Sequence, residues 1–71
     1  MEDKAAITKA LLPVLQMTRN HADLVSLVYS RDRDNGMEIV TATWEGGTTM
    51  SCNVSCDSGT ALIRDVMRML D

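Results

Sequence analysis

The pair Asn35-Gly36 stands between two runs rich in β-branched and aromatic residues, and it constrains the fold of this 71-residue chain more than any other feature. Asn-Gly is the strongest short-range signal for a β-hairpin, because both central residues of a type I′ turn need a positive φ. A two-residue turn here predicts that Leu27 lies opposite Trp44. One face of the hairpin is then apolar, and its residues are Val25, Leu27, Tyr29, Val40, Ala42 and Trp44.

A second hairpin is predicted at Gly46-Gly47. A two-residue turn at these glycines would direct Met50, with the other apolar residues of the third strand, to the face opposite Trp44. A three-residue loop, residues 46–48, places Met50 opposite Trp44 and returns the apolar side chains to one face. We therefore predict the three-residue loop, with a glycine in its left-handed position.

A helix is predicted over residues 3–19, with Asp3 as its N-cap. Its apolar residues recur with helical spacing and form one stripe: Ile7, Ala10, Leu11, Val14 and Leu15. Pro13 cannot donate to the carbonyl of Lys9 and disfavours helical geometry at the residue before it. We therefore expect a kink, or a break into two short helices, near Leu12.

A second helix is predicted after Asp57 or Ser58, either of which would be its N-cap. Its apolar stripe consists of Leu62, Ile63, Val66, Met67 and Leu70. Its outward positions are Arg64, Asp65, Arg68 and Asp71. The fold class is therefore α+β, with one domain over residues 1–71 and the order α-β-β-β-α. The expected sheet is a three-stranded antiparallel meander in the order 1-2-3, with both helices packed on one face.

Both cysteines, Cys52 and Cys56, fall on the predicted third strand. Four residues apart on a strand, their Cα atoms would be roughly 13 Å apart, beyond the ~7 Å limit for a disulfide. They share the face of Trp44, so we expect buried structural thiols. A metal clip would need two further ligands, and a redox pair normally has the Cys-x-x-Cys spacing.

Other groups that could carry chemistry are few. His21, the one histidine, is expected to be a solvated or capping residue in a loop. The segment Asp57-Ser58-Gly59-Thr60 could offer backbone N–H groups to an anion, but helix capping explains the same residues. We therefore expect a non-enzymatic protein without catalytic residues, cofactor or metal.

The net charge of −3 is not accompanied by any cluster of basic residues. Nucleic-acid-binding proteins normally gather cations along one stripe, so nucleic acid is the less favoured partner. The first residues lack the pattern of a signal peptide, and no apolar run approaches the length of a membrane span. We expect a cytoplasmic protein with reduced thiols and no membrane contact.

The sheet face opposite Trp44 is predicted to be nearly uncharged and rich in hydroxyl groups. Its residues are Leu24, Ser26, Val28, Ser30, Ile39, Thr41, Thr43, Thr49, Ser51, Asn53 and Ser55. Serine and threonine can be ordinary strand residues, but such a face also suits a partner protein or a second copy of the chain. Either this face or an edge strand could form a homodimer.

The order α-β-β-β-α resembles the double-stranded-RNA-binding domain in outline over the whole chain. In that family the last helix opens with a lysine-rich segment that contacts phosphates. The matching stretch here is Asp57-Ser58-Gly59-Thr60-Ala61-Leu62, which has no lysine. The resemblance therefore implies a shared topology and carries no RNA-binding residue over to this chain.

The length, acidity and compact α+β plan also resemble small accessory proteins of phages and mobile elements, including anti-CRISPR inhibitors. That resemblance implies a protein-binding module that occludes a host nuclease by covering its basic nucleic-acid-binding surface. The residues expected to contact such a partner are Asp32, Asp34, Glu38 and Glu45, with Val28, Ile39, Thr41 and Thr43 on the uncharged face. The alternative is a nucleic-acid-binding protein that uses the polar sheet face.

Overall fold

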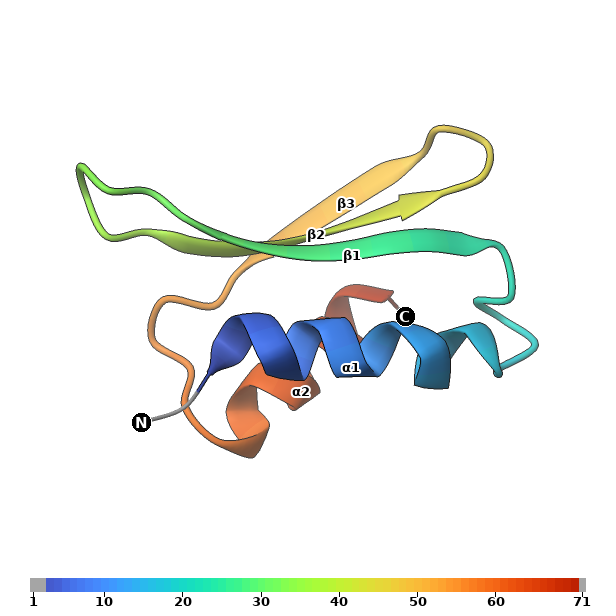
Figure 1. Ribbon diagram of the computed structural model, residues 1–71, viewed down its shortest axis with the longest axis horizontal. Helices are drawn as coiled ribbons and strands as arrows, with labels where there is room; N and C mark the ends of the chain where they lie inside the picture. Colours follow the sequence, from blue (N-terminus) through green and yellow to red (C-terminus); the bar gives the residue numbers. More distant parts are fainter. Residues whose placement is uncertain (1–2, 71) are drawn as a thin grey trace.

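The computed structural model describes residues 3–70, which fold into two helices and a three-stranded antiparallel sheet (Figure 1). The elements are helix α1 (Lys4–Gln16), strands β1 (Leu24–Arg31), β2 (Glu38–Trp44) and β3 (Thr49–Asn53), and helix α2 (Thr60–Leu70). The strands lie in the order β1-β2-β3. The predicted α+β meander is therefore confirmed.

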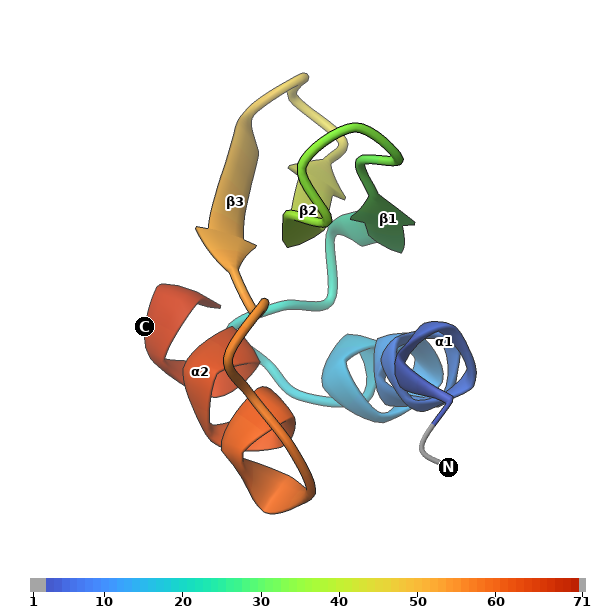
Figure 2. The ribbon, with the colours of Figure 1, turned by 90° about the vertical axis from the view of Figure 1, so that its left-hand side faces the viewer.

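Both helices lie on the same side of the sheet, with α1 beneath β1 and α2 on the side of β3 (Figure 2). The core fills the space between helices and sheet and consists of Leu15, Leu24, Leu27, Val40, Ala42, Val54, Leu62, Val66 and Leu70. Full burial of one aliphatic side chain contributes about 1.5–3 kcal/mol. This one-sided core therefore holds the helices on the sheet, and no other element within residues 3–70 covers the opposite face.

Helix α1 begins where the sequence predicts and continues through Pro13. Asp3 is the N-cap, and its Oδ1 accepts a hydrogen bond from the backbone N–H of Ala6 at 3.0 Å. The expected break into two helices is wrong, because α1 is continuous, and it is shorter than the predicted range of 3–19. Lys9 and Pro13 are both exposed, so the carbonyl that loses its helical donor is on the side open to water.

The buried face of α1 is rotated relative to the predicted stripe. Thr8 is fully buried, whereas Val14 is 56% exposed and Ala10 is also exposed. The Thr8 hydroxyl donates to the backbone carbonyl of Lys4 at 2.7 Å, so its polar group is satisfied inside the protein. This bond makes burial of a threonine possible on the face that α1 turns to the core.

The first hairpin has the predicted faces but a different register. Leu27 lies opposite Ala42 instead of Trp44, a displacement of two residues along β2. Side chains on a strand alternate with a period of two, so this displacement leaves the side chains from Ser26 to Ser30 on their expected faces.

The turn of this hairpin explains the new register. Within this turn only Gly36 has a positive φ, 72°, so Asn35 does not complete a type I′ turn. The backbone N–H of Asp32 donates to the carbonyl of Met37 at 2.8 Å, which leaves four residues, 33–36, in the loop. The predicted two-residue turn is therefore wrong.

A bulge near the start of β1 exchanges two predicted positions. The pairing with β2 shifts between Leu24 and Ser26. Leu24, expected on the open side, is only 2% exposed, and Val25, expected inside, is 51% exposed. A bulge inserts one extra residue and so reverses the alternation beyond it.

The second hairpin has the predicted loop length, displaced by one residue. Its loop is residues 45–47, because the N–H of Trp44 donates to the carbonyl of Thr48 at 2.9 Å. Gly47 has a φ of 88°, which confirms a glycine in the left-handed position. Met50 no longer faces Trp44, but it stays on the helix-covered side.

Helix α2 matches its predicted stripe closely. Leu62, Val66 and Leu70 are buried, and the remaining stripe positions are partly buried. Arg68 lies in the last turn, where a cation is favoured by the helix dipole. The expected outward position of Asp71 lies outside the described residues. Within residues 3–70, neither helix combines the length and apolarity that crossing a bilayer requires.

Candidate functional site

The side of the sheet away from the helices presents a regular uncharged surface. Register aligns three rows across the strands: Ser26–Thr43–Thr49, Val28–Thr41–Ser51 and Ser30–Ile39–Asn53. We call these residues the open face. None of them is charged, whereas a solvated antiparallel face commonly carries Lys and Glu.

The structure brings together four residues that the sequence analysis placed in a binding site. Thr41 is at the centre of the open face and pairs directly with Val28 on β1, while Ile39 and Thr43 lie two residues away along β2, one in each adjacent row. Val28 is 53% exposed, so an apolar spot is open to solvent among hydroxyl groups. A surface without charge at its centre is typical of the buried part of a protein interface.

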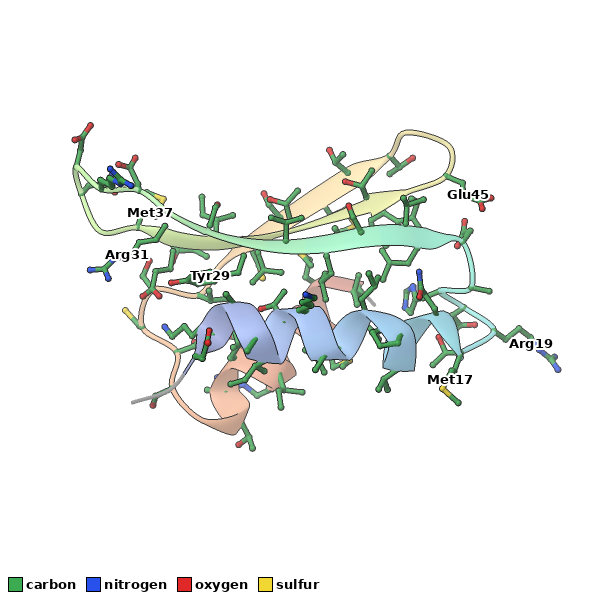
Figure 3. All side chains as sticks on the ribbon, in the orientation of Figure 1. Met17, Arg19, Tyr29, Arg31, Met37 and Glu45 are labelled. Carbon is green, nitrogen blue, oxygen red and sulfur yellow. The ribbon has the colours of Figure 1, made fainter. Side chains whose placement is uncertain are left out.

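The acidic residues of the predicted site lie at the two ends of the sheet. Asp32 and Asp34 occupy the turn after β1, beside Arg31, and Glu45 occupies the turn after β2 at the far end (Figure 3). All three acids are exposed. They therefore flank the open face at opposite ends and do not form one negative patch.

Glu38, the fourth predicted acid, is directed to the helix-covered side. Its carboxylate accepts hydrogen bonds from Lys4 Nζ, at 3.2 Å to Oε1, and from the Tyr29 hydroxyl at Oε2. Lys4 Nζ also donates to the carbonyl of Val54 at 2.9 Å. The backbone N–H of Glu38 donates to Ser55 Oγ at 2.8 Å, so Ser55 also belongs to this cluster and not to the open face. Glu38 thus joins α1 to the sheet, and its carboxylate already has partners.

The electrostatics of this cluster follow from its hydrogen bonds. The bond from Tyr29, and then the bond from Lys4, lower the pKa of the Glu38 carboxyl. The same bond to Glu38, together with burial, raises the pKa of the Tyr29 hydroxyl. The sequence analysis missed this cluster, although Glu38 shares its strand alternation with buried Val40, and Lys4 precedes buried Thr8 by one helical turn.

Neither aromatic ring contributes to the open face. Tyr29 is directed toward α1 (Figure 3), and the Trp44 ring packs against His21 with ring centroids 6.3 Å apart. Single-stranded nucleic acids bind to basic grooves in which bases stack on aromatic side chains. The nine residues of the open face include neither a cation nor an aromatic ring.

The prediction that both cysteines lie on the third strand is wrong. Cys52 lies on β3 and is half-buried, whereas Cys56 is exposed in the turn after β3, and both thiols are free. Burial, followed by the negative charges of Asp65 and Asp57, raises the pKa of the Cys52 thiol. A raised pKa keeps this thiol protonated near neutral pH and therefore weakly nucleophilic.

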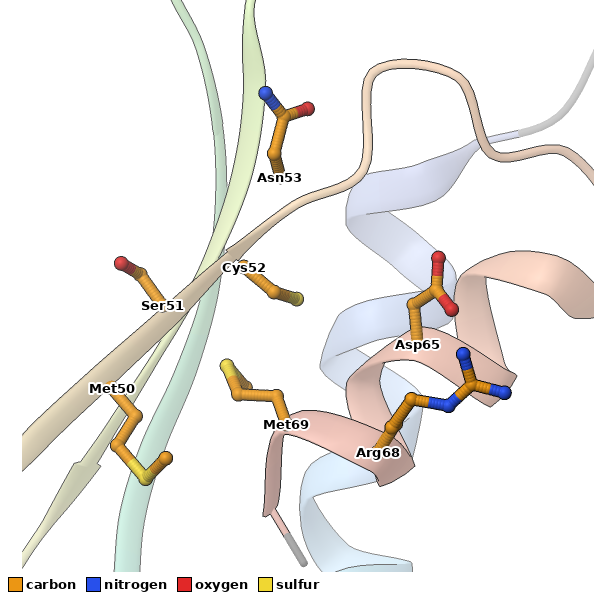
Figure 4. A pocket seen from close by; sticks show the side chains of 7 residues that line it. All are labelled: Met50, Ser51, Cys52, Asn53, Asp65, Arg68 and Met69. Atoms are coloured by element: carbon orange, nitrogen blue, oxygen red, sulfur yellow. The ribbon is translucent and has the colours of Figure 1, made fainter.

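An open groove of about 400 Å³ runs between β3 and α2 (Figure 4). Its residues are Met50, Ser51, Cys52, Asn53, Asp65, Arg68 and Met69. The Cys52 and Met69 side chains point toward one another across it, and Asp65 and Arg68 lie on its helical wall. The sequence analysis missed this groove, because it depends on how far α2 stands from the edge strand.

The start of α2 holds two carboxyl groups and is a poor site for an anion. Burial, and then a hydrogen bond and charge repulsion with Asp65, raise the pKa of Asp57. The bond to Asp57, followed by Arg64, lowers the pKa of Asp65, and Arg64 Nε lies 3.2 Å from Asp65 Oδ1. The helix begins at Thr60, so neither Asp57 nor Ser58 is the residue directly before it, where an N-cap stands.

Within residues 3–70, no three or more His, Cys, Asp and Glu side chains are grouped so that they could hold a metal ion. Comparisons of the chain with protein-family models, curated proteins and solved structures gave no match.

Proposed function

We propose that the chain is a small, non-enzymatic protein-binding module that acts through its open face. The observation that carries this proposal is the set of three uncharged rows, which neither helix covers. Val28 supplies exposed apolar area, and the hydroxyls of the other rows can exchange water for hydrogen bonds with a partner. The acidic residues Asp34 and Glu45 stand in the turns beyond the two outermost rows, which matches an interface with an uncharged centre and a polar rim.

The proposed partner is a basic nucleic-acid-binding protein, and the proposed activity is inhibition of a host nuclease by an anti-CRISPR-like protein of a phage or mobile element. Asp34 and Glu45 at the two ends of the sheet would attract a basic surface over a distance. Asp32 is less available, because its Oδ1 accepts from the backbone N–H of Asp34 at 2.8 Å and so shapes the turn. We place the protein in the cytoplasm, where two free thiols such as Cys52 and Cys56 stay reduced.

The test is inhibition of DNA cleavage by a panel of purified RNA-guided nucleases. Wild-type protein should block one of them, and Thr41→Lys should not, because the new cation stands at the centre of the open face. Thr48→Lys is the matched control: it makes the same change at an exposed loop position beside that face and should still inhibit. If no nuclease is inhibited, or if both variants inhibit like wild type, the proposal is wrong.

The acidic ends can be tested in the same assay. Asp34→Lys should weaken inhibition about tenfold or less, mainly by slowing association, and added salt should reduce the difference from wild type. A complex that is indifferent to both salt and Asp34→Lys would show that the acids do not steer the partner.

A further inference from the structure

The two edges of the sheet differ in how well they are protected against pairing with another strand. On β1, a bulge interrupts the register between Leu24 and Ser26, and the strand ends in Arg31. The β3 edge has no charged residue, no proline and no break in its pairing with β2. Bulges and charges are the usual means of blocking an edge strand, so β3 is the unprotected edge.

The backbone of β3 offers a defined set of hydrogen-bonding groups. The N–H of Val54 donates to Glu38 at 2.8 Å, and the carbonyl of Thr48 accepts from Trp44 at 2.9 Å. Along an antiparallel strand, successive residues direct their backbone N–H and C=O groups alternately to one side of the strand and to the other. The even-numbered residues of β3 therefore bond to β2. The N–H and C=O groups of Thr49, Ser51 and Asn53 therefore point away from the sheet.

The helix-covered side of β3 is also incompletely buried. Val40 and Ala42 on β2 are fully buried, but Met50 on the adjacent β3 is 44% exposed and Cys52 is half-buried. Both residues line the open groove between β3 and α2 (Figure 4). A chain of 71 residues has a small core, so further burial of this apolar area would matter for its stability.

We propose that β3 pairs antiparallel with β3 of a second copy of this chain, about a two-fold axis through Ser51. This register pairs all five residues: Ser51 faces its own copy, Thr49 faces Asn53, and Met50 faces Cys52. The outward backbone groups of Thr49, Ser51 and Asn53 then bond to each other across the axis. The two sheets join into one six-stranded sheet, each contributing three strands.

The groove residues fit the same two-fold symmetry. A two-fold interface brings residue i of one copy to residue j of the other and j to i. Asp65 and Arg68 lie on the helical wall of the groove, next to the β3 residues that would pair. Met50 and Cys52 of both copies would be covered together. The open face stays accessible in this dimer, so the inference stands independently of the proposed function.

The first test is molar mass by light scattering over a series of concentrations. The wild-type protein should reach twice the chain mass of 7.8 kDa, and Ser51→Pro should stay at the chain mass. Proline removes an N–H that points outward, so the ladder between β2 and β3 is kept, and circular dichroism should be unchanged. Ser51→Thr keeps the N–H and should remain a dimer.

The second test is disulfide trapping in a Cys56→Ser background. Met50→Cys should give a covalent dimer on mild oxidation, because the introduced thiol would face Cys52 of the other copy at a Cα separation of ~4.5 Å. Cys56→Ser alone, and Thr43→Cys in that background, should trap much less. A monomer at every concentration would overturn the proposal, as would a dimer that survives Ser51→Pro but dissociates with Thr41→Lys. The latter result would move the contact to the open face.

Discussion

Val40 and Val28 lie on neighbouring strands of one sheet and point to opposite sides of it. Val40 is fully buried beneath the helices, and Val28 is 53% exposed among hydroxyl groups. The covered face also includes a charged residue, Glu38, which is held by two hydrogen bonds, whereas the open face has no charge at all. On the sheet itself, therefore, the more exposed face is the uncharged one, which is the contrast that the proposed binding role rests on.

The largest expected contrast comes from the same truncation on the two faces. Val40→Ala should lower the free energy of unfolding by about 2 kcal/mol, because it leaves a cavity in a packed core. Val28→Ala should change it by about 0.5 kcal/mol or less, since its side chain is half in solvent. Urea denaturation of both variants measures the two values.

A similar loss for both valines would contradict the assignment of the open face as unpacked surface. The result also separates stability from function. Val28→Ala should fold like the wild type and still bind its partner less tightly, whereas any functional loss in Val40→Ala should follow the unfolded fraction.

The second contrast concerns the polar cluster on the covered face. Glu38→Gln should lower Tm by about a few degrees at neutral pH, because it removes the charge that accepts from Lys4 and Tyr29. The pKa of Glu38 is lowered on folding, so its contribution is present above its ordinary pKa of 4.5 and is lost as pH falls through the folded value. The pKa of Tyr29 is raised, so its contribution is lost as pH rises above 10.0.

Thermal melts over a pH series check this window. The Tm difference between wild type and Glu38→Gln should shrink toward acid pH, and Asp34→Asn, an exposed acid in a turn, is the matched control and should show little difference at any pH. A Glu38→Gln difference that is constant across the series would mean that packing, and not charge, accounts for the loss.

The alternation of β-strands explains why the two faces could be predicted from sequence although the registers could not. Leu27, Tyr29, Val40 and Ala42 were assigned to the covered face, and a displacement of two residues leaves that assignment intact. The register depended on the turn, and there the side chains of Asp32 and Asn35 bond to the loop backbone at 2.8 Å and favour a longer loop. Local hydrogen bonds of this kind compete with the preference of Asn-Gly for a two-residue turn.

The errors at Leu24, Thr8 and Glu38 all concern interactions that hydrophobic spacing does not encode. The bulge beside Leu24 appears only in its pairing with β2, and the Glu38 carboxylate, on the helix-covered side by strand alternation, is bonded to Lys4 on α1. Burial of Thr8 depends on one hydroxyl bond within α1. The open face was predicted nearly complete, because simple alternation decides it.

The smallest expected effect lies at the boundary of the covered face, where Asp57 and Asp65 meet beside α2. The pKa of Asp57 is raised on folding, so its stabilising contribution exists at low pH and is lost as pH rises through the folded value. Asp57→Asn removes the repulsion and should stabilise the protein near neutral pH by about 0.5 kcal/mol or less, because solvent screens the pair. Asp65 has a lowered pKa, so Asp65→Asn should destabilise the protein at the same pH.

Urea denaturation at neutral and acid pH would detect these opposite signs of the change in the free energy of unfolding, and both differences should fade when the carboxyls are protonated. Equal signs for the two variants would show that the carboxyls do not act as a pair, and that charge at this end of the groove is simply solvated.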